Sequence, residues 1–417
     1  MLNTIIMDSF DLYLNSLNNK NRLDFVEFQG INWISFYRDI SLIEERNALV
    51  LDSNSNSLFK NTKPYYRSIS PGCKICGEGK WSCLFITNKC NASCFYCPAS
   101  QDQDAIPTTQ SLTFHSPEEY AEYVKFFGFK GVAFSGGEPL LFFDKTLAYL
   151  KAVRKICPDV YIWIYTNGIL ADKEKMTKLA EAGLNEIRFD IGATDYNIDK
   201  IKFVSGLIPN ITVEIPAVPE KTELLLMLLK QLESVGVTNL NLHQLRLTEY
   251  NAPRLLKHNY TYVNGERPIV LESEISALKI LKYAKENSMN IGVNYCSFFY
   301  KYRFQKAGFR KILANRAGVN PNDVTENGFI RKIEGNQLEY NTFSISHTPN
   351  KNSKILNIGN EKYFLKTEKA GFKIDFDDDI KSFLSEIKSD KLLKIPIDDE
   401  KFQIYSKECI EKGLREI

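Results

Sequence analysis

Three cysteines lie close together in the segment Cys90-Asn-Ala-Ser-Cys94-Phe-Tyr-Cys97 and have the spacing C-x3-C-x2-C. Three thiolates this close in one loop can converge on one cubane iron–sulfur cluster and leave its fourth iron without a protein ligand. An open iron is a position where a reacting molecule can bind. A zinc site is the alternative, but zinc usually takes four ligands in two pairs, and no fourth Cys or His adjoins these three.

A second motif, Ser135-Gly136-Gly137-Glu138, follows a short apolar run. Its two glycines let the backbone approach a ligand closely, and a carboxylate beside them can bind an ammonium group. Alone, the motif could be an ordinary strand-to-helix turn. Both motifs follow predicted strands, however, and the catalytic groups of a barrel collect on the loops after the carboxyl ends of its strands.

The cysteine spacing, Tyr96 before the third cysteine and the position after a first strand closely resemble the radical S-adenosylmethionine superfamily. The resemblance implies a [4Fe-4S] cluster on Cys90, Cys94 and Cys97, with S-adenosylmethionine chelating the fourth iron. It implies that one electron, from a donor such as flavodoxin or ferredoxin, cleaves the cofactor to a 5'-deoxyadenosyl radical that abstracts a substrate hydrogen. The segment 135–138 then matches the family motif that binds the amino group of S-adenosylmethionine.

Further candidates for cofactor contact lie along the following strands. Thr166 and Asn167 end the third strand, where the family often places polar contacts to the ribose or carboxylate. Arg188 could pair with the cofactor carboxylate as a fork donor, or be an exposed strand residue. Glu214 is a charge inside an apolar run, so it either faces the inside of the barrel (the lumen) or lies on the surface. His243 is either a hydrogen-bonded core imidazole or a substrate contact.

A second set of cysteines raises the question of another metal site. Cys73 and Cys76 form a C-x2-C turn between glycines, and the chain from Cys76 to Cys83 can extend roughly 23 to 25 Å, enough for the turn to reach the top of the barrel. Cys296 follows a late apolar strand and is expected near that upper face, whereas Cys83 is expected low on the barrel. We hypothesise an auxiliary iron–sulfur cluster on Cys73, Cys76 and Cys296, with Cys83 as a weaker fourth candidate. A structural zinc site and free cysteines are the alternatives.

The pairing of Pro71-Gly-Cys-x2-Cys with the later Asn294-Tyr-Cys also resembles a little-characterised group of radical enzymes related to the pyruvate formate-lyase activating enzyme. This resemblance covers roughly residues 70 to 315 and implies no specific substrate. We expect a peptide or protein substrate, because additions at both ends of the barrel and an auxiliary cluster suit radical enzymes that act on large molecules. Chemistry on a small metabolite or nucleotide, and a non-catalytic iron–sulfur or zinc-binding interaction module, are the alternatives.

Short apolar runs alternate with stretches of helical period from about residue 84, which predicts an α/β fold with a parallel sheet. Six repeats predict a partial (β/α)6 TIM-like barrel. The predicted strands are 84–87, 131–135, 161–166, 186–191, 211–218 and 239–244, with a further short strand at 291–294. The predicted helices are 117–127, 145–155, 173–182, 195–205, 223–235 and 272–287.

Three regions are expected along the chain. Residues 1–70 form an N-terminal extension, 71–315 the barrel with its cysteine-rich entry segment, and 316–417 a small C-terminal accessory domain. In the last region we expect short strands at 329–333, 342–346 and 363–367, followed by a charged helical tail.

Composition narrows the partners and the compartment. The 53 basic and 51 acidic side chains leave a net charge of +2, which argues against a nucleic-acid partner or an anionic membrane. The chain has no basic start followed by a long apolar run, so we expect a cytoplasmic protein that no membrane holds. Nine cysteines, six of them within 73–97, indicate metal ligation in a reducing compartment. Cys157 and Cys409 match neither motif and are expected to be packing residues. The oligomeric state stays open.

Overall fold

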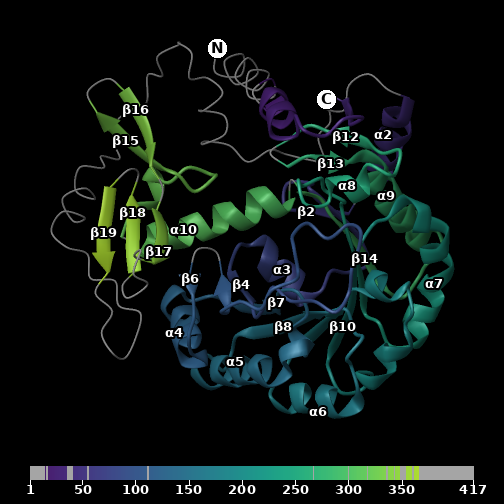
Figure 1. The fold of residues 1–417 in the computed structure, drawn as a ribbon, viewed down its shortest axis with the longest axis horizontal. Coiled ribbons are helices and arrows are strands. Elements are labelled where there is room, and N and C mark those ends of the chain that lie inside the picture. The colour runs from purple at the N-terminus through teal and green to yellow at the C-terminus, as the bar shows by residue number, and fades with distance from the viewer. Residues whose placement is uncertain are drawn as a thin grey trace.

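The computed structural model describes residues 15, 17–34, 41–53, 56–109, 112–265, 267–298, 300–316, 318–334, 337–341, 343–347, 354–358 and 361–365. Its centre is a sheet of seven parallel strands that curves into a partial TIM-like barrel (Figure 1). In neighbour order these strands are β4 (Trp81–Phe85), β7 (Gly131–Ser135), β8 (Tyr161–Thr166), β9 (Glu186–Phe189), β10 (Asn210–Pro216), β11 (Asn239–His243) and β14 (Gly292–Cys296).

The predicted partial barrel is confirmed, and β14 adds one parallel strand to the six expected. Cys296 on this strand pairs in register with His243 on β11, so the short strand predicted before Cys296 belongs to the barrel itself. A crossover helix separates β11 from β14, which is what a parallel pair requires. Antiparallel strands extend both edges of the sheet: β3 (Lys63–Tyr66) and β2 (Ser57–Leu58) beyond β14, and β5 (Thr108–Thr109) and β6 (Leu112–Thr113) beyond β4.

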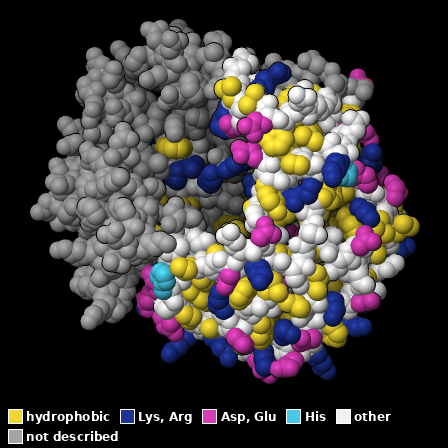
Figure 2. All heavy atoms as spheres, in the orientation of Figure 1, with side chains coloured by type: hydrophobic (Ala, Val, Ile, Leu, Met, Phe, Trp, Pro, Cys, Tyr) yellow, Lys and Arg dark blue, Asp and Glu magenta, His cyan; other side chains and the backbone are white. Residues whose placement is uncertain are grey.

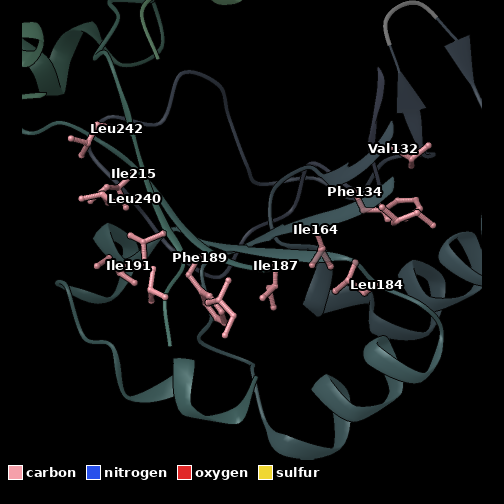
Figure 3. Close-up of a cluster of buried hydrophobic side chains, with 14 of the residues drawn as sticks. Val132, Phe134, Ile164, Leu184, Ile187, Phe189, Ile191, Ile215, Leu240 and Leu242 are labelled. Carbon is pink, nitrogen blue, oxygen red and sulfur yellow. The ribbon is translucent and has the colours of Figure 1, made fainter. Parts of the chain in front are cut away.

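Helices cover the outer face of the sheet (Figure 1). Their apolar faces pack against the outward-pointing side chains of the strands, among them Val132, Phe134, Ile164, Ile187 and Phe189, which are buried in one continuous core (Figure 3). The inward-pointing positions of the same strands are therefore left for polar and aromatic groups. The outer helices are α4 (Pro117–Phe127), α5 (Phe143–Ile156), α6 (Lys173–Glu181), α7 (Thr222–Ser234) and α9 (Leu271–Glu286).

The helix predicted at 195–205 is wrong. Two short 3-10 turns, η2 (Ile191–Thr194) and η3 (Asp199–Phe203), occupy this connection. Asp195 and Tyr196 have φ angles of 50° and 64°, which a right-handed helix does not allow. The side chain of Asn197 accepts a hydrogen bond from the Asp199 amide at 2.8 Å, so a local turn replaces the helical hydrogen bonds.

The helix α3 (Pro71–Gly77) lies within the barrel, enclosed by the curved sheet (Figure 1). The Ser70 side chain caps its start by accepting from the Cys73 amide at 3.2 Å, and Pro71 occupies the first turn. A Cβ atom on Gly72 would stand 2.4 Å from Nη2 of Arg188, so the glycine allows the helix to press against the inner face of the sheet. The turn predicted for Cys73 and Cys76 is thus a helix, and a spacing of three residues puts both thiols on one face of it.

The described N-terminal elements β1 and α2 pair or pack with later elements of the chain. The strand β1 (Asn32–Ile34) pairs with β12 (Thr261–Val263), which pairs with β13 (Ile269–Val270). The helix α2 (Ser41–Ser53) is tied to α9 by an ion pair between Arg46 and Glu274 at 2.6 Å, with both side chains fully buried. The remaining short helices are η1 (Pro139–Phe142), η4 (Pro219–Lys221), α8 (Ala252–Leu255), η5 (Tyr300–Gln305), α10 (Lys306–Arg316) and η6 (Pro321–Asp323).

The strands predicted after residue 315 correspond to β15 (Ile330–Glu334), β17 (Phe343–His347) and β19 (Glu361–Leu365). Two unpredicted strands, β16 (Gln337–Asn341) and β18 (Lys354–Ile358), pair with them. The predicted helical tail and Cys409 lie outside the described residues, and the boundaries at 70 and 315 stay predictions. None of the described helices is long and apolar enough to cross a lipid bilayer. Positive and negative side chains are interspersed over the coloured surface in Figure 2.

Candidate functional site

A cavity of about 610 Å³ runs along the inside of the barrel and is within the size range of ligand pockets. Both cysteine sets border it. The lining includes Cys90, Cys94 and Cys97 from the loop after β4, and also Cys73, Cys76, Cys83 and Cys296. The structure therefore brings the two predicted sites into one cavity, and Cys83, expected far from the catalytic loop, lies in the wall of the same cavity.

Backbone hydrogen bonds shape the cysteine loop from within. The amide of Cys90 donates to the carbonyl of Gln101 at 3.0 Å and closes the loop. The amide of Cys97 donates to the carbonyl of Cys94 at 3.1 Å, which forms a tight turn between the last two cysteines. The three thiols consequently come from one compact loop at the carboxyl end of β4.

The segment after β11 holds this loop from outside. Arg254, on α8, donates through Nε to the carbonyl of Phe95 and through Nη2 to that of Cys97, both at 3.1 Å. The side-chain amide of Asn251 donates to the carbonyl of Tyr96 at 3.1 Å. Sequence reasoning missed Arg254 and Asn251, because nothing in a local pattern shows that residues so far along the chain return to the loop.

The two glycines of the 135–138 motif dock the end of β7 onto the stem of the cysteine loop. Gly136 has a φ of +139°, and a Cβ atom there would lie 2.2 Å from the carbonyl oxygen of Thr87. A Cβ atom on Gly137 would lie 2.1 Å from the carbonyl oxygen of Lys89. The Gly137 amide donates to Thr87 at 2.8 Å, and the Glu138 amide donates to Lys89 at 2.9 Å. Only residues without a side chain permit this approach.

Glu138 is not among the residues that line the cavity, and its contact with the amine of S-adenosylmethionine stays a prediction. The side chain is buried and accepts three internal hydrogen bonds, from the Leu140 amide at 2.9 Å, the Thr166 hydroxyl at 2.8 Å and the Asn167 amide at 2.7 Å. Burial raises the pKa of Glu138 to about 7. Its place is behind the cavity wall, where it holds the ends of two strands together.

Thr166 and Asn167 line the cavity, as does Ser135. The side-chain amide of Asn167 points at the cysteine loop, 3.6 Å from Sγ of Cys90 and 2.8 Å from Oδ1 of Asn91. Asn167, at the end of the third parallel strand, therefore contacts the first cysteine of the loop directly, and the contact of Thr166 and Asn167 with the cofactor stays a prediction.

Arg188 faces the lumen but is already paired, so a fork to the cofactor carboxylate is not available. Its Nε lies 2.8 Å from Oε1 of Glu186, and its Nη1 lies 2.6 Å from Oε2 of Glu214. The Ser70 hydroxyl is a further partner, 3.2 Å from Nη2. All three charged side chains are almost fully buried, and the pair holds the pKa of Glu214 well below its usual range. Arg188 thus joins β9 and β10 to the start of α3 rather than standing exposed on a strand.

His243 lies between a carboxylate and an ammonium group. Its Nε2 contacts Oε1 of Glu214, and Nζ of Lys301 lies 2.7 Å from its Nδ1. Because the ammonium group can only donate, Nδ1 accepts and Nε2 carries the proton that it donates to Glu214. Burial, with Lys301 nearby, lowers the pKa of His243 to about 4, so the ring is neutral. Of the two positions predicted for Glu214, the structure places it in the lumen.

Tyr96 is paired with a carboxylate that the sequence analysis missed. Its hydroxyl donates to Oδ1 of Asp190 at 3.0 Å, and both residues line the cavity. Burial raises the pKa of Asp190 to about 6. The available signal was its position directly after β9, because polar residues at the carboxyl ends of barrel strands face the site.

The second cysteine set gathers deep in the lumen. Cys76 on α3 and Cys296 on β14 pack in one buried cluster with Tyr300, and Cys73 is buried one helical turn from Cys76. Burial raises the pKa of the Cys76 and Cys83 thiols to about 12. The side chain of Lys63, which sequence reasoning missed, is completely buried beside these thiols. Burial lowers the pKa of its ammonium group, but electrostatic attraction to Cys296, Cys73 and Cys76 outweighs this effect and raises the pKa.

Among the residues that the structure describes, no three His, Cys, Asp or Glu side chains stand close enough together to hold a single metal ion. A cubane cluster has a different requirement, because each thiolate binds a separate iron and the thiolates surround the cluster. Cys90, Cys94 and Cys97 come from one loop, border one cavity and influence one another's pKa values. This donor set fits a three-thiolate [4Fe-4S] cluster.

Comparison with known sequences identifies relatives for this part of the chain. Residues 84–214, which include both motifs, match the model of the Radical SAM superfamily. A protein of Methanocaldococcus jannaschii named "Putative glycyl-radical enzyme activating enzyme MJ0021" is 31% identical over 293 residues, which are 66% of this chain and 76% of that protein. The GTP 3',8-cyclase of Aquifex aeolicus is 36% identical over 112 residues, 26% of this chain and 33% of the cyclase.

Solved structures match this chain at low similarity. HydG, a maturase of the [FeFe]-hydrogenase, has a TM-score of 0.37 and 11% identity over 72% of this chain and 78% of its own. SuiB of Streptococcus suis bound to S-adenosylmethionine has a TM-score of 0.36 and 11% identity over 61% of this chain, which spans only 51% of SuiB. The assignment rests on the match to the family model and on the similarity to the Methanocaldococcus protein. These two findings show that this chain belongs to the radical S-adenosylmethionine superfamily of enzymes.

Proposed function

We propose that this enzyme cleaves S-adenosylmethionine reductively at a [4Fe-4S] cluster held by Cys90, Cys94 and Cys97, and that its substrate is a peptide or protein. The observation that carries the first part is the compact cysteine loop at the edge of a cavity lined by the ends of β7 and β8. When bound, the cluster and S-adenosylmethionine supply a 5'-deoxyadenosyl radical that abstracts a substrate hydrogen. A flavodoxin or ferredoxin is the proposed source of the electron.

The residues of the chain position the reactants and exclude water. Arg254 and Asn251 hold the cysteine loop, and the Tyr96 hydroxyl is fixed by Asp190. Glu138 is a positioning residue, because it holds Thr166 and Asn167 where they face the cavity. The residues proposed to contact S-adenosylmethionine are six cavity-lining members of the predicted set, namely Tyr96, Ser135, Gly136, Gly137, Thr166 and Asn167. Arg188 and Glu214 also line the cavity, but they are paired with each other.

The substrate class rests on the Methanocaldococcus relative, of which the chain covers 76% and whose name describes an enzyme that activates another enzyme. The cavity is compatible with a peptide segment, since it continues past the cysteine loop to polar side chains such as His243, Lys301 and Gln244. Of these, the Lys301 ammonium group keeps further N–H donors that can pair with the carbonyl groups of an extended chain.

Formation of 5'-deoxyadenosine tests the reaction. The anaerobically reconstituted enzyme, given S-adenosylmethionine and dithionite, should release 5'-deoxyadenosine, which is measured by liquid chromatography and mass spectrometry. Cys94→Ala should lose this activity almost completely, because a cluster ligand is gone. Cys157→Ser is the matched control, since this buried thiol lies outside the cavity lining. Equal product from wild type and Cys94→Ala would overturn the proposed role of the loop.

Deuterium transfer tests the substrate class. Extracts of the source cells grown on deuterated medium are split by ultrafiltration into a protein and peptide fraction and a small-molecule fraction. The fraction that contains the substrate should transfer deuterium into 5'-deoxyadenosine during turnover. We expect transfer from the protein and peptide fraction, and loss of the transfer after protease treatment. Transfer from the small-molecule fraction alone would overturn the proposed substrate class and favour a metabolite or nucleotide.

A further inference from the structure

We propose that Cys73, Cys76 and Cys296 hold a second iron–sulfur cluster, deep in the lumen of the same barrel. The proposal deepens the proposed function, because the cluster would lie in the wall of the cavity where the substrate radical forms. The metal content of the second site is measured without turnover. The proposal can therefore be confirmed or overturned independently of S-adenosylmethionine cleavage.

The three thiols come together from distant parts of the chain. Cys73 and Cys76 share one face of α3, and Cys296 ends β14, whose alternate side chains Asn294 and Cys296 point inward. The relative exposure of the three residues is 2%, 6% and 3%, yet all three border the cavity. The helix α3 enters the lumen and brings Cys76 into one buried cluster with Cys296, and Cys73 lies one turn away on the same helix.

Nitrogen donors already point at the sulfur atoms. The side-chain amide of Asn241 donates to Sγ of Cys73 at 3.7 Å, and that of Gln305 donates to Sγ of Cys76 at 2.6 Å. Hydrogen bonds to ligand sulfur are one of the means by which proteins set the potential of iron–sulfur clusters. The lumen therefore supplies both ligands and donors to those ligands.

Lys63 is a second, independent indication of a ligand. Its residue exposure is 0%, and within the part of the chain that the structure describes its ammonium nitrogen has no hydrogen-bond partner. Its Nζ lies over the Tyr300 ring, 4.5 Å from the ring centroid. A buried, unpaired ammonium group is unfavourable unless an anion compensates it. Three thiolates on a [4Fe-4S] core of charge +2 carry a net charge of −1, which Lys63 would balance.

Two unpaired acceptors lie on the neighbouring strands β11 and β14. Oδ1 of Asn241 and Oδ1 of Asn294 are both buried without a hydrogen-bond partner among the described residues. The two asparagines are neighbours in register on β11 and β14. Buried polar atoms are normally paired, so these two oxygens need a donor, which a bound substrate or water can supply and a cluster cannot.

An iron–sulfur cluster explains the donors better than a zinc ion does. A cluster brings bridging sulfides that can accept hydrogen bonds from Lys63, whereas a zinc ion adds no acceptor. Zinc would also need a fourth ligand converging on the same point. Cys83, whose thiol lies in the same wall of the cavity, is available to the fourth iron of a cluster, as is a substrate group.

Metal analysis of a chain without the first cluster tests the proposal. The Cys90→Ala/Cys94→Ala/Cys97→Ala variant, reconstituted anaerobically with iron and sulfide and desalted, should retain about four irons and about four sulfides per chain. Adding Cys76→Ser and Cys296→Ser should remove them, whereas adding Cys157→Ser should not. Electron paramagnetic resonance after reduction should show a cluster signal in the triple variant and in its Cys157→Ser derivative. The derivative with Cys76→Ser and Cys296→Ser should show none.

A variant with the loop intact guards against misfolding as the cause. Cys76→Ser/Cys296→Ser should keep about four of the about eight irons of wild type and should keep the circular dichroism of the wild-type fold. One zinc per chain and no iron in the triple variant would overturn the cluster in favour of a zinc site. Neither metal in the triple variant, with the fold retained, would overturn the site itself. Iron in the triple variant together with no S-adenosylmethionine cleavage by wild type would contradict the proposed function alone.

Discussion

Glu138 shows how a motif residue can organise a site from behind the cavity wall. Its carboxylate accepts from two backbone amides and one hydroxyl behind the cavity wall, and the neighbouring glycines do the close packing against the cysteine loop. A carboxylate is suited to this position, because it accepts through both oxygens and donates nothing.

Glu138→Gln should therefore destabilise the protein. The amide would turn an NH2 group toward backbone N–H donors, so at least one buried donor loses its acceptor, at a cost of about 1–3 kcal/mol. Urea unfolding of the cluster-free protein measures the loss. Glu174→Gln, at a carboxylate with a side-chain exposure of 77%, is the control and should change nothing. A large rise in KM for S-adenosylmethionine with unchanged stability would contradict this structural role and would support the direct contact with the cofactor amine that the sequence predicts.

His243 should make stability depend on pH. Its pKa of about 4 in the folded chain lies below the ordinary value of 6.5, so the unfolded chain binds more protons between these two values. The contribution of this ring to the free energy of unfolding is fully present above about pH 6.5 and is lost as pH drops toward about 4. The loss is on the order of 2 kcal/mol. The charged groups facing the ring are Glu214, Lys301 and Lys63.

The measurement is urea unfolding of wild type and His243→Asn at about pH 7.5, above the ordinary pKa of histidine, and at about pH 5, between that value and the pKa of the folded chain. The free energy of unfolding should drop more between the two pH values in wild type than in the variant. An identical pH dependence of the two proteins would show that the ring is protonated in the folded state, contrary to the paired arrangement with Lys301.

At the scale of elements, α3 is the feature that sequence patterns misjudged. Its seven residues read as a turn because of the flanking glycines, but Gly72 and Gly77 serve close packing inside the barrel instead. The Cβ of a residue at 77 would meet the Phe59 ring at 2.2 Å. The helix forms because Ser70 caps it and the lumen encloses it, since an isolated helix of this length is not stable in water.

Gly72→Ala should displace this helix. The new methyl group would overlap Nη2 of Arg188 and Oε2 of Glu186, which are locked in a buried ion pair, so overpacking should cost about 1–3 kcal/mol. Lys74→Ala, at an exposed position on the same helix, is the matched control. Thermal unfolding of both variants checks the prediction.

Iron analysis adds a second readout for the same variant. Displacing α3 should reduce iron at the proposed second site and leave the cysteine loop, which other elements hold, with its own iron. Full iron retention together with wild-type stability would show that the lumen accommodates the methyl group, and that α3 does not position the thiols as described.

For the whole molecule, the decisive property is that one barrel encloses both cysteine sets. Seven parallel strands place alternate side chains in the lumen, and α3 enters that lumen with two of the thiols. A single cavity can then hold the reacting cofactor at one part of its wall and the proposed second cluster at another. The shelter that radical chemistry requires follows from the enclosure by the barrel.

The sequence by itself determined the cysteine loop, the glycine motif and the repeating strand-helix order, and hence the family and the fold. Each of these is a local pattern, since ligand spacing and alternating apolar runs are complete within a few residues. The interpretation failed where the outcome depended on distant partners. Residues 195–205 formed turns instead of a helix, although their local pattern suggested helical period.

Only the tertiary structure decided what the buried charges and the second thiols do. Arg188 could not be assigned until Glu186, Glu214 and Ser70 were seen to surround it. Cys73 and Cys76 could not be joined to Cys296 until α3 was found inside the barrel. The physical reason is the same in both cases: a buried polar group is defined by its partners, and these partners come from distant segments that meet only when the sheet curves.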